Sequence, residues 1–304
     1  MRILLTGITG FVGQNVLPMI VREVPETEVL TLNIPADLEK ARSMYPYPNC
    51  RHILTSELDE VIGFNPEIVI HLATVTTARN DTEIIKPMLA ANIEFGVLLL
   101  DALTRCDALN LFVNTGSFAE YRYGPSVLND AYLYTATKSA FRHFVDYYSQ
   151  LKGFKYVTVV PYSIYGGKPT VKRLIDYIVE SIDAQEPVDM TAGEQILDFT
   201  HVCDLAGFYV HILKHLNLFL NLNNGEEFHI GTGKGSSIKE LAAIVEKVYG
   251  KKCNIRWGGR PYRDRDIMYA VAPIAKNLSL VNWRAKVTVE QGIKMMKENI
   301  YVCE

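Results

Sequence analysis

The chain has 304 residues, of which 48% are hydrophobic and 21% charged, and its formal net charge at pH 7 is -3. This composition is typical of a globular protein with a sizeable core, and it lacks the basic excess of a nucleic-acid-binding protein. No stretch approaches the roughly 18 apolar residues of a membrane helix, and the N-terminus is a poor signal peptide, so we expect a cytoplasmic protein without nucleic-acid or membrane partners.

The first half of the chain alternates short strands with helices. Strands rich in valine, isoleucine and leucine on both faces, each followed by a helix, indicate a parallel sheet covered on both sides. Right-handed crossovers then give an α/β, Rossmann-like doubly wound fold. The strands are predicted at 2–7, 28–33, 67–73, 110–117 and 156–166, and the helices at 11–24, 85–106 and 131–151.

The alternation weakens in the second half of the chain. Helical patterns at 170–185 and 237–250 are separated by short strands and polar loops. We predict a dinucleotide-binding domain at residues 1–165, to which the chain returns near 195–230. Residues 166–304 are expected to form mainly a smaller, substrate-binding α/β lobe.

The segment TGITGFVG lies directly between the first predicted strand and the first predicted helix. Glycines in this position let the backbone turn tightly and approach a phosphate, which binds to the free amides at the helix N-terminus. The G-x-x-G-x-x-G spacing is a variant of the dinucleotide fingerprint and predicts a dinucleotide cofactor. The residues assigned to cofactor binding here are Gly7, Thr9, Gly10, Phe11, Val12 and Gly13.

Asn33, at the end of the second strand, is the residue expected near the adenosine ribose. A carboxylate in this position binds the ribose 2'-hydroxyl and repels a 2'-phosphate. Because Asn33 is uncharged, the sequence favours NADP and leaves NAD open.

Tyr134 and Lys138 are four residues apart at the start of a predicted helix and therefore share one helix face. A free phenol has a pKa of about 10 and is a poor proton shuttle at neutral pH. Lys138, together with the positive ring of an oxidised nicotinamide, is expected to lower the pKa of Tyr134. Tyr134 can then supply the proton that accompanies hydride transfer to a carbonyl.

Several motifs, in order along the chain, resemble those of a known family. TGITGFVG, VNTGSFAEY, YTATK, VVPYSIYG and DFTHVCDLA are similar to motifs of the extended short-chain dehydrogenase/reductases, in the NAD-dependent epimerase/dehydratase group that acts on nucleotide sugars. The resemblance spans almost the whole chain. It implies an NAD(P)-dependent enzyme with a nucleotide-sugar substrate, and a homodimer formed by the helices near 87–106 and 133–151.

The resemblance also implies roles for individual residues. Tyr134 matches the catalytic tyrosine, Lys138 its partner, which also holds the nicotinamide ribose, and Ser117 the residue that hydrogen-bonds the reacting sugar oxygen. Further cofactor-binding residues assigned in this way are Leu72, Ala73, Asn92 and Pro161.

The substrate is expected to meet Ser117 and residues of three other segments. Arginine side chains suit the diphosphate of a nucleotide sugar, because their planar forks match phosphate oxygens. The other residues assigned to substrate binding are Phe118, Ser163, Tyr165, Arg260 and Arg263.

The residues after Ser117 narrow the reaction. Dehydratases of this family carry an aspartate and a glutamate where this chain has Phe118 and Ala119, so dehydration is disfavoured, although Glu120 is one residue away. The NTGSFAEY block looks more like the nucleotide-linked 4-keto-6-deoxysugar reductases, such as the CDP-abequose synthase type, than like UDP-galactose 4-epimerases. We therefore expect reduction at C4 with Tyr134 as proton donor. The alternatives are a 4-epimerase with tightly bound NAD and, less favoured, a non-catalytic dinucleotide sensor.

The five cysteines are far apart, odd in number and include no CxxC pair. This pattern argues against a disulfide framework and against a zinc site. We expect reduced thiols and no bound metal. The cysteines are Cys50, Cys106, Cys203, Cys253 and Cys303.

Overall fold

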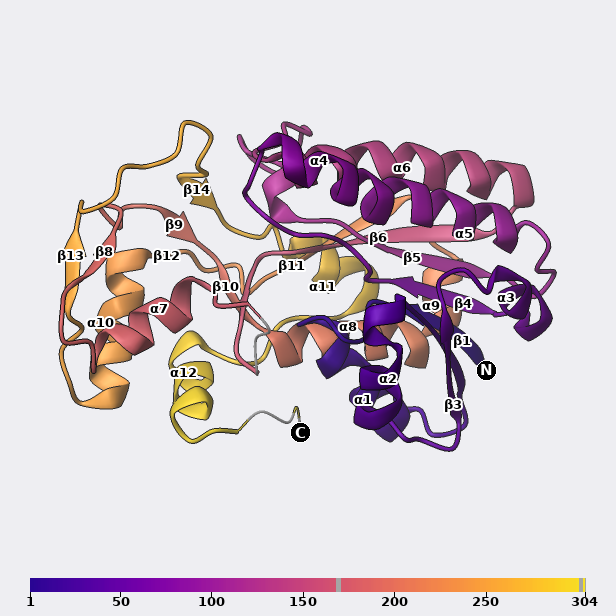
Figure 1. Cartoon of the computed structure of the whole chain (residues 1–304), viewed down its shortest axis with the longest axis horizontal. Coiled ribbons are helices and arrows are strands. Elements are labelled where there is room, and N and C mark those ends of the chain that lie inside the picture. Colours follow the sequence, from indigo (N-terminus) through magenta and orange to yellow (C-terminus); the bar gives the residue numbers. More distant parts are fainter. Residues whose placement is uncertain (168–170, 301–302, 304) are drawn as a thin grey trace.

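Seven parallel strands form one large sheet in the order β11-β6-β5-β4-β1-β2-β3 (Figure 1). The computed structural model describes residues 1–167, 171–300 and 303. The sheet confirms the predicted doubly wound α/β fold. Its strands are β1 (Arg2–Thr6), β2 (Glu28–Asn33), β3 (Cys50–Leu54), β4 (Ile68–His71), β5 (Leu111–Thr115), β6 (Lys155–Pro161) and β11 (Glu226–Ile230).

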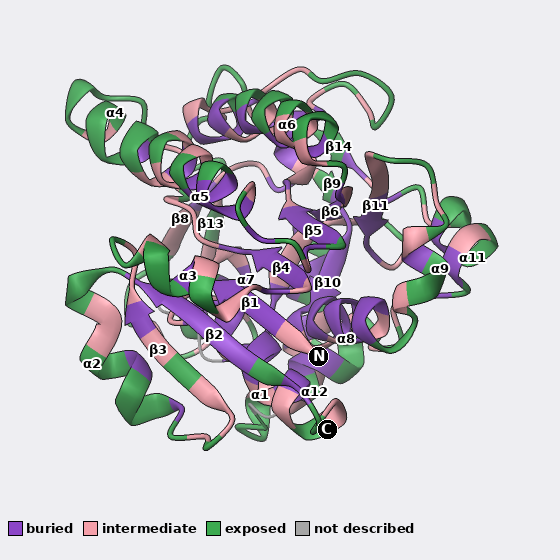
Figure 2. Cartoon of the chain, turned by 90° about the vertical axis from the view of Figure 1, so that its right-hand side faces the viewer, coloured by how far each residue is buried: buried purple, intermediate pink, exposed green. Residues whose placement is uncertain are grey.

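Helices cover both faces of this sheet. Along β1, Ile3 and Leu5 belong to the core shared with α1 and α8, whereas Leu4 belongs to the core shared with α5 and α6. The alternation follows from the two-residue period of a strand, and it explains why β1 is apolar on both faces. Figure 2 shows the buried residues along the central strands. The helices that cover the sheet include α1 (Gly13–Glu23), α4 (Thr82–Leu89), α5 (Phe95–Leu103), α6 (Leu133–Lys152) and α8 (Val202–Lys214).

The outer part of the sheet was not predicted. β3 is an edge strand in which only Ile53 is buried, so it lacks the apolar run that marks the central strands. The helix before it, α2 (Pro35–Met44), buries only Ala41, and its amphipathic pattern is correspondingly weak. The short helix α3 (Leu58–Phe64) follows β3 and was also missed.

The helix predicted at 85–106 is confirmed as a helical run from Thr82 to Leu103, but its middle turn is π-helical. After α4 the chain forms a π-helical turn, η1 (Ala90–Glu94), and then α5. A π-helical turn inserts an extra residue into a helix and is frequent at functional sites. Asn92, which is buried, lies in this turn.

A smaller lobe lies to the left of the sheet in Figure 1, and its core, which includes Leu241 and Ile293, is continuous with Tyr134 of α6 and Val160 of β6. The helix predicted at 170–185 corresponds to α7, and Thr170 lies outside the described residues. No helix in the described part of the chain has both the length and the hydropathy that crossing a bilayer requires. The elements of this lobe include α7 (Leu174–Ser181), β8 (Val188–Met190), β9 (Ile196–Leu197), β12 (Ser236–Ser237), α10 (Ile238–Tyr249), β13 (Ile255–Trp257), β14 (Tyr269–Ala270) and α12 (Val289–Lys297).

The chain crosses between the sheet and the lobe more than once. The strand predicted at 156–166 divides into β6 and β7 (Ser163–Tyr165), and β7 pairs in parallel with β10 (Phe199–His201). After β10, α8 packs against α1, and β11 then pairs in parallel with β6. The remaining helices are α9 (Leu216–Leu220) and α11 (Ala275–Val281).

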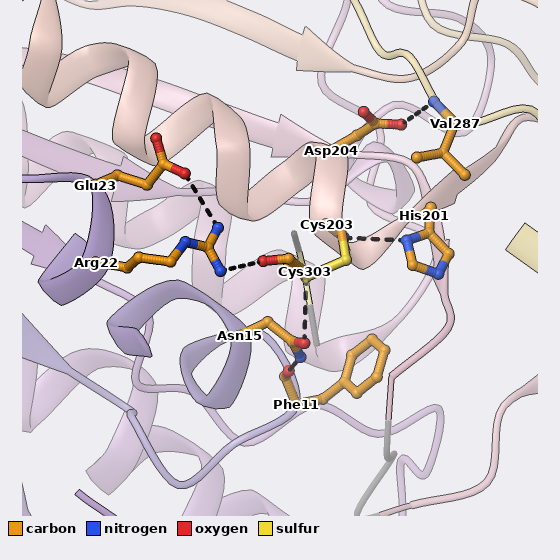
Figure 3. The surroundings of a disulfide bond; sticks show 9 residues. All are labelled: Phe11, Asn15, Arg22, Glu23, His201, Cys203, Asp204, Val287 and Cys303. Atoms are coloured by element: carbon orange, nitrogen blue, oxygen red, sulfur yellow. Dashed lines mark hydrogen bonds and ion pairs between the residues drawn. A yellow bond between two sulfur atoms is a disulfide. The ribbon is translucent and has the colours of Figure 1, made fainter. Parts of the chain in front are cut away.

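The expectation of reduced thiols is wrong for two cysteines. Cys203, in the first turn of α8, and Cys303 form a disulfide (Figure 3). They are separated by 100 residues, so their pairing depends on how the end of the chain returns to α8, which sequence spacing does not reveal. Cys50, Cys106 and Cys253 are free thiols.

The disulfide lies beside the helix that follows the glycine loop (Figure 3). The Sγ atom of Cys303 is 3.6 Å from Oδ1 of Asn15, and Nδ2 of Asn15 donates a hydrogen bond of 2.8 Å to the carbonyl oxygen of Phe11. The guanidinium of Arg22 donates to the carbonyl oxygen of Cys303. Cys303 is thereby held against α1.

Candidate functional site

A cavity of about 510 Å³ lies where the carboxyl ends of the central strands meet the smaller lobe. Ligands of open α/β sheets bind at this edge, because the loops after parallel strands gather there. The sheet contributes Leu72 after β4, Ser117 after β5 and Pro161 at the end of β6. The lobe contributes Arg173, Leu197 and others. The cavity is therefore shared by both parts of the fold.

The glycine loop borders this cavity through Val12. Gly7 has a φ of +72°, and a Cβ atom there would lie 2.7 Å from the backbone nitrogen of Ala73. A Cβ atom on Gly13 would overlap the carbonyl oxygen of Gly7. Both positions therefore require glycine. No side chain caps the N-terminus of α1, but the amides of Gln14 and Asn15 donate to the carbonyl oxygens of Gly10 and Val12, so a phosphate would have to bind to amides of the loop that precedes them.

Thr9 and Asn33, which the sequence assigned to cofactor binding, are not among the residues that line the cavity. Asn33 is buried, and its Nδ2 donates a hydrogen bond of 2.9 Å to Oγ1 of Thr31. Oγ1 of Thr9 donates a hydrogen bond of 2.8 Å to the carboxylate of Asp37. Sequence reasoning missed Asp37, because this acid follows the end of β2 by four positions and belongs to α2.

Asn92 acts on the loop after β4. Its Oδ1 accepts hydrogen bonds from the amide of Val75 and the hydroxyl of Thr74, at 2.7 and 3.1 Å. Its Nδ2 donates to the carbonyl of Val75 and to the hydroxyl of Thr137 on α6. Thr74 lines the cavity, so Asn92 stabilises one wall of the cavity through its hydrogen bonds to this loop.

The three residues predicted to be catalytic lie together in the cavity wall. The Ser117 Oγ and Tyr134 OH atoms are 3.2 Å apart, within hydrogen-bond distance. The Nζ atom of Lys138 donates a hydrogen bond of 2.7 Å to the carbonyl oxygen of Thr115. Ser117 and the carbonyl group of Thr115 therefore lie at or just after the end of β5. Tyr134 and Lys138 lie in the first turns of α6.

The pKa of Tyr134 shifts in the direction opposite to the one expected. Tyr134 is only 8% exposed, and burial raises the pKa of its phenol to about 12, although the hydrogen bond with Ser117 acts in the other direction. Burial also lowers the pKa of Lys138 to about 8. Desolvation is the largest cause of both pKa shifts, that of Tyr134 and that of Lys138.

The predicted substrate residues divide into two groups. Phe118, Ser163 and Tyr165 line the cavity. The ring of Phe118 stacks on Tyr162, with their centroids 5.5 Å apart, and forms an aromatic wall. The hydroxyl of Tyr165 lies 3.4 Å from the carbonyl oxygen of Thr288, so only its ring faces the cavity.

Arg260 and Arg263 are exposed and do not line the cavity. The arginine that does is Arg173, which sequence reasoning missed because it stands in the first part of a helical pattern with no motif around it. Its guanidinium lies over the ring of Phe11, 4.0 Å from the centroid, and its Nε atom is buried without a hydrogen-bond partner in the described structure. Arg173 therefore joins the glycine loop to the lobe.

The charge of the cavity wall is positive. Lys138 and Arg173 are its charged residues, and no aspartate or glutamate among the described residues lines it. Glu120, which the sequence left open as an acid for dehydration, is fully buried behind the wall. The described residues contain no group of histidine, cysteine and acidic side chains that could hold a metal ion. The wall suits an anionic ligand, and its uncharged polar side chains are the hydroxyls of serine, threonine and tyrosine.

Known proteins are similar to this chain over its whole length. The model of the family described as NAD dependent epimerase/dehydratase matches residues 3–231. CDP-abequose synthase from Salmonella muenchen is 26% identical, covering 97% of this chain and 96% of its own, and that from Yersinia pseudotuberculosis is 23% identical, covering 88% and 91%. The solved structure of a mutant UDP-glucuronic acid 4-epimerase from Bacillus cereus, in complex with UDP-4-deoxy-4-fluoro-glucuronic acid and NAD, has a TM-score of 0.84 at 20% identity and covers 99% of both chains.

Proposed function

The chain belongs to the NAD-dependent epimerase/dehydratase family, and we propose that it reduces the C4 carbonyl of a nucleotide-linked 4-keto-6-deoxy sugar. The observation that carries the proposal is the contact of 3.2 Å between Ser117 Oγ and Tyr134 OH inside a cavity that also contains Lys138. The CDP-abequose synthases support the choice of reaction, because they are similar over nearly the full length of the chain.

In the proposed mechanism a bound nicotinamide dinucleotide supplies the hydride. Ser117 donates a hydrogen bond to the carbonyl oxygen and orients it, and Tyr134 gives that oxygen its proton. The phenol of Tyr134 has a pKa of about 12, so it carries its proton at neutral pH, and positive charge near the bound substrate must lower this pKa before Tyr134 can act as the donor. Lys138 places a positive charge near the tyrosine, which stabilises the phenolate that the reaction leaves.

The glycine loop that precedes α1 is proposed to hold the cofactor pyrophosphate. Two residues bear on the choice between NADP and NAD. Asn33 places no charge at the end of β2, which supports NADPH as the reductant. Asp37, bonded to Thr9 of the loop, would repel a 2'-phosphate and supports NAD(H).

The sugar is proposed to lie against the aromatic and apolar part of the wall. Phe118, Tyr162, Leu197 and Phe199 line the cavity there. Such a surface accommodates the methyl group of a 6-deoxy sugar better than a charged or hydroxylated carbon. Arg173 is proposed to bind the diphosphate, in place of the exposed Arg260 and Arg263.

A nucleotide-sugar 4-epimerase with tightly bound NAD is the second candidate. The fold similarity to a UDP-glucuronic acid 4-epimerase and the position of Asp37 favour it. A non-catalytic dinucleotide sensor is the third, and it is disfavoured because serine, tyrosine and lysine are all retained around one cavity.

A homodimer is proposed on the helical face made by α5 and α6. Leu98, Tyr147 and Leu151 are 53%, 60% and 61% exposed there, which is unusual for large apolar side chains unless another surface covers them. Pairing of this face with its copy would bury them in a four-helix arrangement.

The test is nicotinamide absorbance with purified protein, NADPH or NADH, and a panel of nucleotide-linked 4-keto-6-deoxy sugars. Net oxidation of the reduced nicotinamide by the wild type, and not by Tyr134→Phe, is the expected result. If no sugar causes net oxidation and denaturation releases bound NAD, the epimerase is correct and UDP-hexoses are the next substrates. Binding of a dinucleotide that stays chemically unchanged with every sugar of both sets would identify a sensor.

A further inference from the structure

A cluster of buried charges lies directly behind the catalytic wall. Glu120, in the short 3-10 turn η2 (Phe118–Glu120), is fully buried and forms an ion pair of 2.7 Å with Nε of Arg142 on α6. Arg142 also pairs with Glu227 on β11. Burying the carboxylate of Glu120 costs free energy even though it is paired with the largely buried Arg142, so this pair is not explained by stability alone, whereas Glu227 is partly exposed. The cluster joins the turn after β5, the long helix α6 and the outer strand β11.

This cluster touches the segment that carries the proposed catalytic contacts. Oε1 of Glu120 accepts a hydrogen bond of 2.6 Å from the backbone amide of Ser117. A Cβ atom on Gly116 would lie 2.7 Å from Glu120 and 2.8 Å from the guanidinium of Arg142, so the backbone is packed directly on the ion pair. On either side of Gly116, Thr115 accepts the hydrogen bond of Lys138, and Ser117 contacts Tyr134.

We propose that Glu120 is a positioning residue, which holds the turn of Ser117 through its amide and keeps the ammonium of Lys138 charged by its own negative charge. The inference rests on the proposed function, because it assigns Glu120 a task only through Ser117 and Lys138. Glu120 does not line the cavity and acts neither as the acid nor as the base of a dehydration. Glu120 follows Ser117 by three residues and places its negative charge behind the cavity wall.

The charges around Lys138 agree with this assignment. Burial lowers the pKa of Lys138 to about 8, the negative charge of Glu120 raises it, and the positive charge of Arg142 lowers it. On β4, burial lowers the pKa of His71 to about 3, so that side chain is neutral. Tyr134 on α6 is also neutral, since its pKa is about 12. The positive charge of Arg173 in the lobe lowers the pKa of Tyr134. Glu120 is therefore the negative charge that opposes the loss of the Lys138 proton.

The test measures the affinity of the full chain for NADH and NADPH, from nicotinamide fluorescence, between about pH 6 and about pH 10. This readout needs no sugar substrate and no turnover. The variants are Lys138→Met, Glu120→Gln and Glu120→Asp. The control is Asp204→Asn, which alters another buried carboxylate whose oxygens accept amide hydrogen bonds of 2.9 Å from Lys286 and Val287.

In the wild type the affinity should fall as Lys138 loses its proton, with a midpoint at about 8. Glu120→Gln keeps an acceptor for the amide of Ser117 but removes the charge, and it should move this midpoint to lower pH by about one unit. Glu120→Asp restores the charge and should restore the midpoint. Asp204→Asn should lower the melting temperature and leave the midpoint where it is.

The outcomes separate this inference from the function it rests on. If Lys138→Met abolishes the pH dependence while Glu120→Gln titrates like the wild type, Glu120 does not set the charge of Lys138 and the inference is overturned. If Lys138→Met binds cofactor with the pH dependence of the wild type, Lys138 is not at the cofactor, and both the site assignment and the inference fail. A shift with Asp204→Asn as large as that with Glu120→Gln would show a general loss of packing and also overturn it.

Discussion

The guanidinium of Arg173 lies 4.0 Å from the centroid of the Phe11 ring and so connects the lobe to the glycine loop across the cavity. Its buried Nε has no hydrogen-bond partner within the described residues, which leaves a donor free for a phosphate oxygen.

Replacing Arg173 with glutamine should raise KM for the nucleotide sugar about tenfold to a hundredfold, because a charge-assisted hydrogen bond contributes roughly 1.5 to 3 kcal/mol. The measurement is steady-state kinetics at saturating cofactor. Arg263→Gln is the matched control, since Arg263 is exposed and outside the cavity wall, and it should change KM less than about twofold. A larger increase in KM with Arg263→Gln than with Arg173→Gln would place the diphosphate outside the cavity, near Arg263.

The pH profile of kcat/KM should show a basic limb at about pH 8, set by Lys138. Activity is expected to be constant below that pH, where the ammonium is charged, and to fall above it. Tyr134, with a pKa of about 12, stays protonated throughout this range and contributes no limb. In Lys138→Met the limb should disappear and the rate should be low at every pH. A basic limb that survives this substitution would belong to another group.

Replacing Asp37 with asparagine should increase the affinity for NADPH relative to NADH by about tenfold, because a carboxylate beside the glycine loop repels a 2'-phosphate. Fluorescence titration of both cofactors with both proteins measures this ratio. The amide oxygen of the new side chain can still accept the hydrogen bond of Thr9, which preserves the local structure. An unchanged ratio would place the adenosine ribose away from this residue.

Cys303→Ser should lower the melting temperature by the order of 5 to 10 °C in the absence of reductant, because a disulfide that closes a long loop restricts the unfolded chain. Calorimetry under non-reducing conditions measures the change, and addition of dithiothreitol should lower the wild type to the value of the variant. Cys50→Ser, which removes a partly exposed free thiol, is the control and should change the melting temperature less. Alkylation of both Cys203 and Cys303 in the untreated, denatured protein would contradict the bond.

Tyr147→Glu together with Leu151→Glu should convert the proposed dimer to a monomer, because two charges on each copy would face an apolar partner surface. Light scattering after size-exclusion chromatography gives the mass directly. Tyr269→Glu, on the exposed β14 of the smaller lobe, is a control with similar exposure, 62%, and should leave the mass unchanged. A wild-type mass of about 34 kDa, equal to that of one chain, would exclude the dimer.

Much of the fold was accessible from the sequence because its strongest patterns belong to buried elements. β1 and β4 are buried at nearly every position and carry runs of three apolar residues, and the glycine loop requires a strand before it and a helix after it. The motifs also identified Ser117, Tyr134 and Lys138, which line one cavity in the structure. These residues are placed by turns adjoining central strands, which local patterns describe well.

The features that were missed depend on contacts between distant segments. Arg173 reaches the cavity only because the lobe folds over the glycine loop, and Asp37 reaches Thr9 only because α2 packs beside that loop. The bond between Cys203 and Cys303 spans 100 residues. The sign of the Tyr134 pKa shift depends on burial, which a spacing of four residues cannot indicate.

The position of β11 at one edge of the large sheet has a consequence for how the protein is made. Its residues, Glu226–Ile230, pair with β6, so until synthesis has passed Ile230 a nascent chain presents an uncovered strand edge beside the apolar Val157 and Val159. A fragment that stops at residue 165 would carry the same open edge and is expected to aggregate when expressed by itself. A fragment meant to contain the predicted dinucleotide-binding domain should therefore extend at least to Ile230, so that β11 covers the edge of β6.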